Sequence, residues 1–197
     1  MNYTKIGNDG LLNWLKTNLT EKRFQHSLGT AETARELGIK FGLDSEKLYV
    51  AGLLHDCAKC FSNEKLKEII DNYLDIEESE IISYKTWHAP VSAYIAQKEF
   101  GVEDEEILSS IRWHTIGKMN MTDFEKIVFL ADKIEPKTRE QSYIDLIAPY
   151  IKEKDGLNKA LLASYKETIM SLVKRDLKIC FATIEIYNKL EECLNVN

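Results

Sequence analysis

The chain has 197 residues, of which 44% are hydrophobic, and it carries a formal net charge of −6 with an isoelectric point near 5.4. This length and composition can bury one substantial core, so we expect a single domain over residues 1–197. The acidic balance argues against a nucleic-acid groove, because binding to a phosphate backbone needs a concentrated basic face. An acidic protein that handles phosphates has to concentrate positive charge locally, through a metal ion or a few Lys and Arg side chains.

Helix dominates the predicted secondary structure, because the chain has only three prolines and nine glycines and few alternating apolar and polar stretches. Thr20 and Asp44 are predicted N-caps of helices over about residues 20–41 and 45–57, and Gly42 is a predicted stop. Further helices are predicted, in chain order, at residues 64–74, 77–85, 88–101, 104–115, 122–135 and 143–154, followed by a periodic apolar packing region from 156 to 194. The sequence therefore predicts an all-α helical bundle.

The N-terminal segment MNYTKIGNDG has no apolar signal-peptide region, and no stretch approaches the roughly 18 apolar residues of a membrane span. We therefore expect a cytoplasmic protein without a membrane partner. The cysteines at 57, 60, 180 and 193 are then expected to be reduced thiols.

The stretch AGLLHDCAKC at residues 51–60 offers two chemistries, a His-Asp pair and a Cys-x-x-Cys pair. A reactive Cys-x-x-Cys pair usually lies where a helix begins, whereas this pair lies near a predicted helix end, where the dipole disfavours the thiolate. A zinc ribbon needs a second close cysteine pair, but Cys180 and Cys193 are thirteen residues apart. Cys57 and Cys60 are therefore expected to be small packing residues.

The histidines point to a different site, because each lies on a different predicted helix or at its end. Helices of a compact bundle can each contribute one inward residue to a central site, as in helical metalloproteins. Asp56 and Asp132 both follow apolar helix segments, and a buried carboxylate needs a cation or a hydrogen-bonding partner. Imidazole and carboxylate together suit iron, manganese or zinc. The sequence therefore predicts a metal site between helices, formed by His26, His55, Asp56, His88, His114 and Asp132.

Five motifs carry a resemblance to a known family: RFQHS at 23–27, AGLLHDCAK at 51–59, HAPVSA at 88–93, RWHTIG at 112–117 and FLADKIEP at 129–136. They resemble the HD-domain phosphohydrolases and, within them, the bacterial symmetrical diadenosine tetraphosphatases. The resemblance implies an HD metal-binding core over residues 20–140, with C-terminal helices over 141–197 packed on it. It also implies a metal-dependent hydrolase that converts diadenosine tetraphosphate and water into two ADP.

The resemblance implies that His26, His55, Asp56 and Asp132 hold one metal ion, and that Asp56 bridges to a second ion held by His88 and His114. It implies a divalent transition metal, with iron favoured and manganese, cobalt or zinc as alternatives. Asp56 and Lys59 are the expected catalytic residues. Substrate contacts are expected from Arg23, Lys59, His88, His114, Thr115 and Arg139. Members of the family place an arginine one position earlier, where this chain has Thr138, so Lys137 is an alternative to Arg139.

Two alternatives remain open at the level of sequence. One is another HD activity, such as a nucleotidase or a guanosine tetraphosphate hydrolase. The other is a non-catalytic helical signalling module whose metal only stabilises the fold. Residues such as Lys59 and the second-site histidines speak against a closed structural site.

Overall fold

The computed structural model describes residues 3–153 and 155–195, and every regular element in these residues is a helix. The predicted all-α fold is confirmed. The α-helices are α1 (Gly7–Asn18), α2 (Glu21–Phe41), α3 (Ser45–Leu54), α4 (Asn63–Tyr73), α5 (His88–Lys98), α6 (Glu105–Trp113), α7 (Asp123–Ile134), α8 (Gln141–Ile147), α9 (Gly156–Lys174) and α10 (Phe181–Asn195), with short 3₁₀ turns at Glu78–Ile81 and Tyr150–Lys152.

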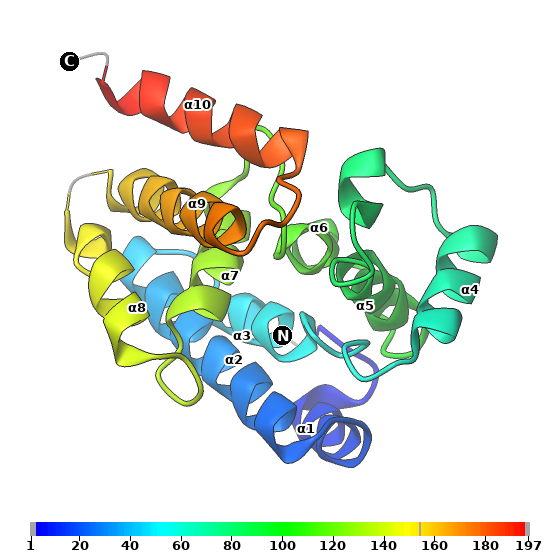
Figure 1. The fold of residues 1–197 in the computed structure, drawn as a ribbon. Coiled ribbons are helices and arrows are strands. Elements are labelled where there is room, and N and C mark those ends of the chain that lie inside the picture. The colour runs from blue at the N-terminus through cyan, green and yellow to red at the C-terminus, as the bar shows by residue number, and fades with distance from the viewer. Residues whose placement is uncertain (1–2, 154, 196–197) are drawn as a thin grey trace.

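Helix α3 is the central helix of the bundle. Each of its residues from Leu48 to Leu54 is buried, which is the pattern of a helix that neighbours surround rather than one with a single core-facing stripe. It packs most extensively on α2 and also contacts α1, α5, α6 and α7. Because α3 ends in the middle of the bundle, the residues that follow it are placed at the centre of the protein (Figure 1).

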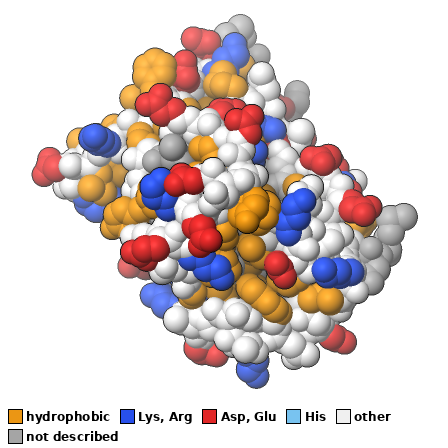
Figure 2. Space-filling model, turned by 90° about the vertical axis from the view of Figure 1, so that its right-hand side faces the viewer, with side chains coloured by type: hydrophobic (Ala, Val, Ile, Leu, Met, Phe, Trp, Pro, Cys, Tyr) orange, Lys and Arg blue, Asp and Glu red, His pale blue; other side chains and the backbone are white. Residues whose placement is uncertain are grey.

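The C-terminal helices lie to one side of this core. Helices α8 and α9 pack against α7, while α10 packs against α9 and lies beyond it, away from α2 and α3 (Figure 1). The domain boundaries predicted from sequence stay a prediction. On the face seen in Figure 2, acidic and basic side chains of the described residues are interspersed, with hydrophobic side chains between them.

The helix starts follow the predicted capping residues. Thr20 and Asp44 accept backbone hydrogen bonds at the starts of α2 and α3, and Thr122 forms a capping box with Glu125 at the start of α7. Gly42 ends α2 in the left-handed conformation, as predicted. Helix α4 begins at Asn63, one residue before the expected start, and its N-cap is Ser62.

Four predicted helices differ from the structure by three residues or more, and one of them is the helix expected over 88–101, which ends at Lys98. The helix expected over 45–57 ends at Leu54, and residues 55–60 form turns. The segment 77–85 forms only a 3₁₀ turn over Glu78–Ile81, and the segment 143–154 belongs to α8 and a second 3₁₀ turn, with residue 154 outside the described residues. The early end of α3 matters most for function, because His55 is then the C-cap of the helix and Asp56 and Lys59 lie in the turns that follow it.

The packing role expected for both cysteines of the Cys-x-x-Cys pair is only half right. Cys57 is fully buried, whereas Cys60 is exposed at the end of the turns. Among the described helices, none has the length and apolar character needed to cross a membrane.

Candidate metal centre

The six predicted metal ligands meet in one buried cluster. His26 comes from α2, His55 and Asp56 follow the end of α3, His88 is the first residue of α5, His114 follows α6, and Asp132 lies near the end of α7. None of the six is more than 5% exposed. Helices that are far apart in sequence therefore converge on one polar centre, as the histidine spacing predicts.

The cluster contains two groups of potential ligands that share Asp56. The first group is His26, His55 and Asp56, and the second is Asp56, His88 and His114. In the first group, the two Nε2 atoms of His26 and His55 are 3.3 Å apart. In the second, Nε2 of His88 is 3.2 Å from Nε2 of His114 and 3.0 Å from Oδ1 of Asp56. Ligand atoms around a metal at about 2.0–2.2 Å have spacings of this size.

Backbone carbonyls orient two of the histidine rings. Nδ1 of His55 donates to the carbonyl of Gly52 at 2.7 Å, and Nδ1 of His114 donates to the carbonyl of Ile111 at 2.7 Å. In the neutral ring this leaves Nε2 without a proton, with its lone pair directed into the cluster. Burial lowers the pKa of His114 to about 4, so its neutral form dominates near pH 7. Burial likewise lowers the pKa of His88.

Asp56 shows that these residues fit a cation. Its Oδ1 atom is buried and makes no hydrogen bond of acceptable geometry, although His88 and His114 lie nearby. Burial favours the neutral carboxyl, but the neighbouring His55 and His88 outweigh burial and hold the pKa of Asp56 well below its ordinary value. A buried, ionised carboxylate oxygen surrounded by imidazole nitrogens is a typical metal ligand. The residues present therefore fit a divalent metal ion.

Asp132 lies beside the first group but also carries ion pairs. Its Oδ1 atom is 2.9 Å from Nε2 of His26 and 2.6 Å from a guanidinium nitrogen of Arg139, and Oδ2 is 3.0 Å from Nζ of Lys133. Burial favours its neutral form, but Lys133 and Arg139 outweigh burial and lower its pKa well below the ordinary value. Its role as a ligand stays a prediction.

Two close helix contacts hold the first group together. A Cβ atom at Gly52 would lie 2.6 Å from Cα of Ala31, so the glycine lets α3 approach the backbone of α2. A Cβ atom at Gly29 would overlap with the carboxylate of Glu135. These glycines therefore bring His26, His55 and the end of α7 into contact.

The predicted basic residues also reach the cluster. Nζ of Lys59 is 2.9 Å from Nε2 of His88 and 3.8 Å from Oδ1 of Asp56. Burial lowers the pKa of Lys59, against the attraction of Asp56. A guanidinium nitrogen of Arg23 is 3.2 Å from Oδ2 of Asp56. Lys59 reaches this place from the turns after α3 and not from a continued helix.

Of the remaining residues predicted to contact the substrate, some lie at the cluster and others lie away from it. Arg139 lies at the cluster, since its Nε also donates to the carbonyl of Asp132 at 2.6 Å. Its alternative Lys137 instead forms an ion pair with Glu32 at 3.1 Å. Thr115 is half-buried and lines a separate pocket beside the cluster.

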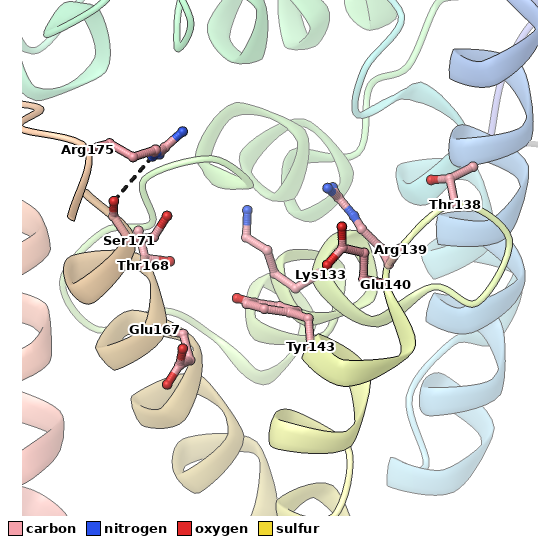
Figure 3. A pocket seen from close by; sticks show the side chains of 9 residues that line it. All are labelled: Lys133, Thr138, Arg139, Glu140, Tyr143, Glu167, Thr168, Ser171 and Arg175. Atoms are coloured by element: carbon pink, nitrogen blue, oxygen red, sulfur yellow. Dashed lines mark hydrogen bonds between the residues drawn. The ribbon is translucent and has the colours of Figure 1, made fainter. Parts of the chain in front are cut away.

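Two functional candidates have no role assigned from the sequence. Glu135 is fully buried, and its Oε1 atom is 3.0 Å from Nδ1 of His26. Lys133 contacts Asp132 and lines a pocket of about 480 Å³ together with Arg139 (Figure 3). Both residues lie in the motif FLADKIEP, where Lys133 directly follows Asp132 and Glu135 lies three residues after it. This proximity to a predicted ligand could have identified them from the sequence.

Comparison with known proteins agrees with this geometry. The HD domain family model matches residues 23–137. A Bacillus subtilis protein named "Bis(5'-nucleosyl)-tetraphosphatase, symmetrical" is 40% identical over 178 residues, which are 89% of this chain and 93% of that protein. A Staphylococcus aureus protein with the same name is 37% identical, over 91% of this chain and 89% of that protein.

A crystal structure from Clostridium acetobutylicum, described as a "predicted HD superfamily hydrolase involved in NAD metabolism", superposes with a TM-score of 0.86. It is 38% identical in sequence, and the match covers 93% of this chain and 96% of that one. The His-Asp cluster, the matched family model and these near full-length relatives lead to one conclusion. The chain belongs to the HD domain family.

Proposed function

We propose that this protein is a metal-dependent hydrolase that cleaves dinucleoside tetraphosphates symmetrically, so that diadenosine tetraphosphate gives two ADP. The observation that carries the proposal is the near full-length similarity to proteins named as symmetrical tetraphosphatases, at 40% and 37% identity. The buried cluster supports it, because hydrolysis of a phosphoric anhydride requires charge stabilisation at the reacting phosphate.

The charge distribution around the cluster suits a polyanion. Among the described residues, four basic side chains contact the two buried aspartates: Arg23 and Lys59 at Asp56, and Lys133 and Arg139 at Asp132. Each is partly exposed, between 22% and 40%, so its charged end faces both the carboxylate and solvent. A chain with a net charge of −6 thus concentrates positive charge where phosphates would bind.

We propose His26, His55, Asp56 and Asp132 as ligands of one metal ion, and Asp56, His88 and His114 as ligands of a second. A divalent metal ion in this cluster supplies Lewis-acid stabilisation of the charge on the phosphate oxygens. We propose iron as the native metal, because the donors are imidazole nitrogens and carboxylate oxygens, which suit iron, and because the family resemblance of the sequence motifs implies it. Elemental analysis of the purified protein distinguishes iron from manganese, cobalt and zinc.

The chain's own residues bind and orient the substrate. Lys59 is the residue we propose at the bridging oxygen of the departing nucleoside diphosphate, since its ammonium lies within 3.8 Å of Asp56 at the shared end of the two groups. Arg23 and Arg139 lie on the other sides of the cluster and bind the flanking phosphates. The buried histidines exclude bulk water from the inner side of the site.

Chromatography of the products tests the proposal. Metal-analysed protein incubated with diadenosine tetraphosphate should release two ADP for each substrate molecule. Release of orthophosphate or pyrophosphate would favour another HD activity, and metal-loaded protein that hydrolyses no nucleotide would favour a non-catalytic module. Asp56→Ala should abolish turnover and retain the helical spectrum, whereas Asp71→Ala, at an exposed site on α4, should retain turnover.

A further inference from the structure

A second pocket lies beside the His88 and His114 half of the cluster. It has a volume of about 440 Å³ and lies between the segment after the first 3₁₀ turn, the residues that follow α6, and the C-terminal end of α9. We call it the Tyr84 pocket, and its lining residues include Tyr84, Thr86, Thr115, Ile116, Leu172 and Arg175. Thr115 directly follows His114, and Thr86 precedes His88 by two residues. The pocket is therefore lined by residues that lie next to His114 and close to His88 in the chain, which are both members of the second ligand group.

The lining of the Tyr84 pocket combines apolar walls with a few polar groups. Ile116 is buried and Leu172 is half-buried, while Tyr84 is 54% exposed, with Nζ of Lys85 6.0 Å from the centroid of its ring. Thr115 and Arg175 add a hydroxyl group and a guanidinium. A flat apolar wall with an aromatic ring and a few polar groups suits a nucleoside, whose base stacks and whose sugar and phosphate need polar partners.

The pocket of Figure 3 lies at the other half of the cluster, and its lining is more polar. Thr138 contacts Nδ1 of His26 at 3.2 Å, and Arg139 contacts Asp132. Figure 3 shows Lys133 and Arg139 on one wall and Arg175 across from them, at the end of α9. Arg175 and Thr168 line both pockets, so the two pockets meet at this end of α9.

The wall that carries Tyr84 is held in place by an ion pair between the buried Glu80 and the half-buried Arg112. Arg112 on α6 donates from two nitrogens to the two carboxylate oxygens of Glu80, each at 2.6 Å, and also donates to the carbonyl of Asp75 at 2.6 Å. The Thr86 hydroxyl donates to the carbonyl of Glu80 at 2.7 Å. These contacts fix the segment on both sides of Tyr84, so the pocket is formed before a ligand binds.

We propose that the Tyr84 pocket binds the nucleoside of one half of the dinucleoside tetraphosphate, and that Arg175 binds phosphate where the two pockets meet. This inference rests on the proposed function and deepens it. The polar pocket of Figure 3 then receives the other half. Because one pocket flanks each ligand group, the centre of the tetraphosphate lies over Asp56, which both groups share. This arrangement accounts for cleavage into equal halves.

The test uses substitutions in the metal-loaded protein that either fill the Tyr84 pocket or remove its aromatic ring. Leu172→Trp places a large ring in the pocket, and Val173→Trp is the matched control, since Val173 is 59% exposed on the same helix and lines neither pocket. Tyr84→Ala removes the stacking surface, and Tyr84→Phe retains it. The probes are ADP and pyrophosphate, which share the diphosphate and differ in the nucleoside.

Leu172→Trp and Tyr84→Ala should each raise the dissociation constant for ADP by about tenfold or more, as loss of base stacking does. Pyrophosphate affinity should stay within about twofold of the wild type. Val173→Trp and Tyr84→Phe should bind ADP like the wild type. Should Leu172→Trp fail to fold, Tyr84→Ala with its Phe control still decides the question.

Unchanged ADP binding in Tyr84→Ala or in folded Leu172→Trp would overturn the pocket assignment, and an equal loss of pyrophosphate binding would do the same. These outcomes leave the proposed function intact wherever the wild-type protein still produces two ADP. If the wild-type protein does not cleave diadenosine tetraphosphate, the proposed function fails instead, independently of these binding results.

Discussion

Glu135→Gln is the substitution that tests most directly how the protein prepares His26 for metal binding. Oε1 of Glu135 lies 3.0 Å from Nδ1 of His26, on the side of the ring that faces away from the other ligands. Burial raises the pKa of Glu135, but the hydrogen bonds from His26 and Thr138 outweigh burial and lower it, so the group is charged near pH 7. Glutamine keeps the shape of the side chain and removes its charge.

The magnitude follows from the burial of the pair. A carboxylate that accepts a hydrogen bond from a ligating histidine fixes its tautomer and raises its basicity, and its loss typically costs about 10- to 100-fold in metal affinity. This corresponds to about 1.4–2.7 kcal/mol. Because Glu135 is 0% exposed and water cannot replace it, we expect a value in the upper half of this range.

Metal affinity is measured by competition with a chromophoric chelator, and circular dichroism reports the fold. Glu36→Gln is the control, since it makes the same charge change at an exposed position on α2, the helix that carries His26. Wild-type metal affinity in a folded Glu135→Gln protein would refute the argument that Glu135 prepares His26.

Three further predictions concern packing, ligand sharing and cysteine reactivity. Gly52→Ala should lower the free energy of unfolding by about 1–3 kcal/mol, because the added methyl group meets the backbone of α2; an unchanged denaturation midpoint would contradict this close contact. Asp56→Asn should reduce the bound metal per chain, measured by elemental analysis, more than His114→Gln does, because Asp56 belongs to both ligand groups; equal losses would contradict a shared ligand. Burial raises the pKa of the Cys57 thiol to about 12, so a thiol reagent at pH 8 should label Cys60 and leave Cys57 unlabelled until the protein unfolds, as mass spectrometry would show.

Sequence patterns predicted the helices well where local chemistry determines them. Thr20, Asp44 and Thr122 cap their helices through side-chain hydrogen bonds that depend only on nearby residues. The end of α3 was placed three residues late, because residues 55–57 continue an apolar run that is equally compatible with helix. The turns at 55–60 depend on tertiary contacts, such as the hydrogen bond that the Ala58 amide donates to Ser92 at 3.1 Å.

The spacing of the histidines and the family motifs predicted that the ligands converge. They did not predict the residues that hold the ligands in place, such as Glu135. Glu135 acts through a contact with His26, 109 residues away, which no local pattern reveals. Arg139 reaches Asp132 although it lies one position later than in the family motif, because it follows α7 in a loop that turns back to the cluster. The sequence likewise did not predict that Cys60 is exposed, because this depends on the path of the turns at residues 55–60.

Because α3 is buried on all sides, local opening should cost more free energy at α3 than at the walls of the Tyr84 pocket. Amide hydrogens from Leu48 to Leu54 should exchange only when the core opens, so His55 and Asp56 follow directly after a segment that we expect to be strongly protected. The walls of the Tyr84 pocket lie in peripheral segments with many exposed residues. Substitutions in these walls should therefore change which nucleotide is accepted without moving the ligand cluster, which the core holds in place.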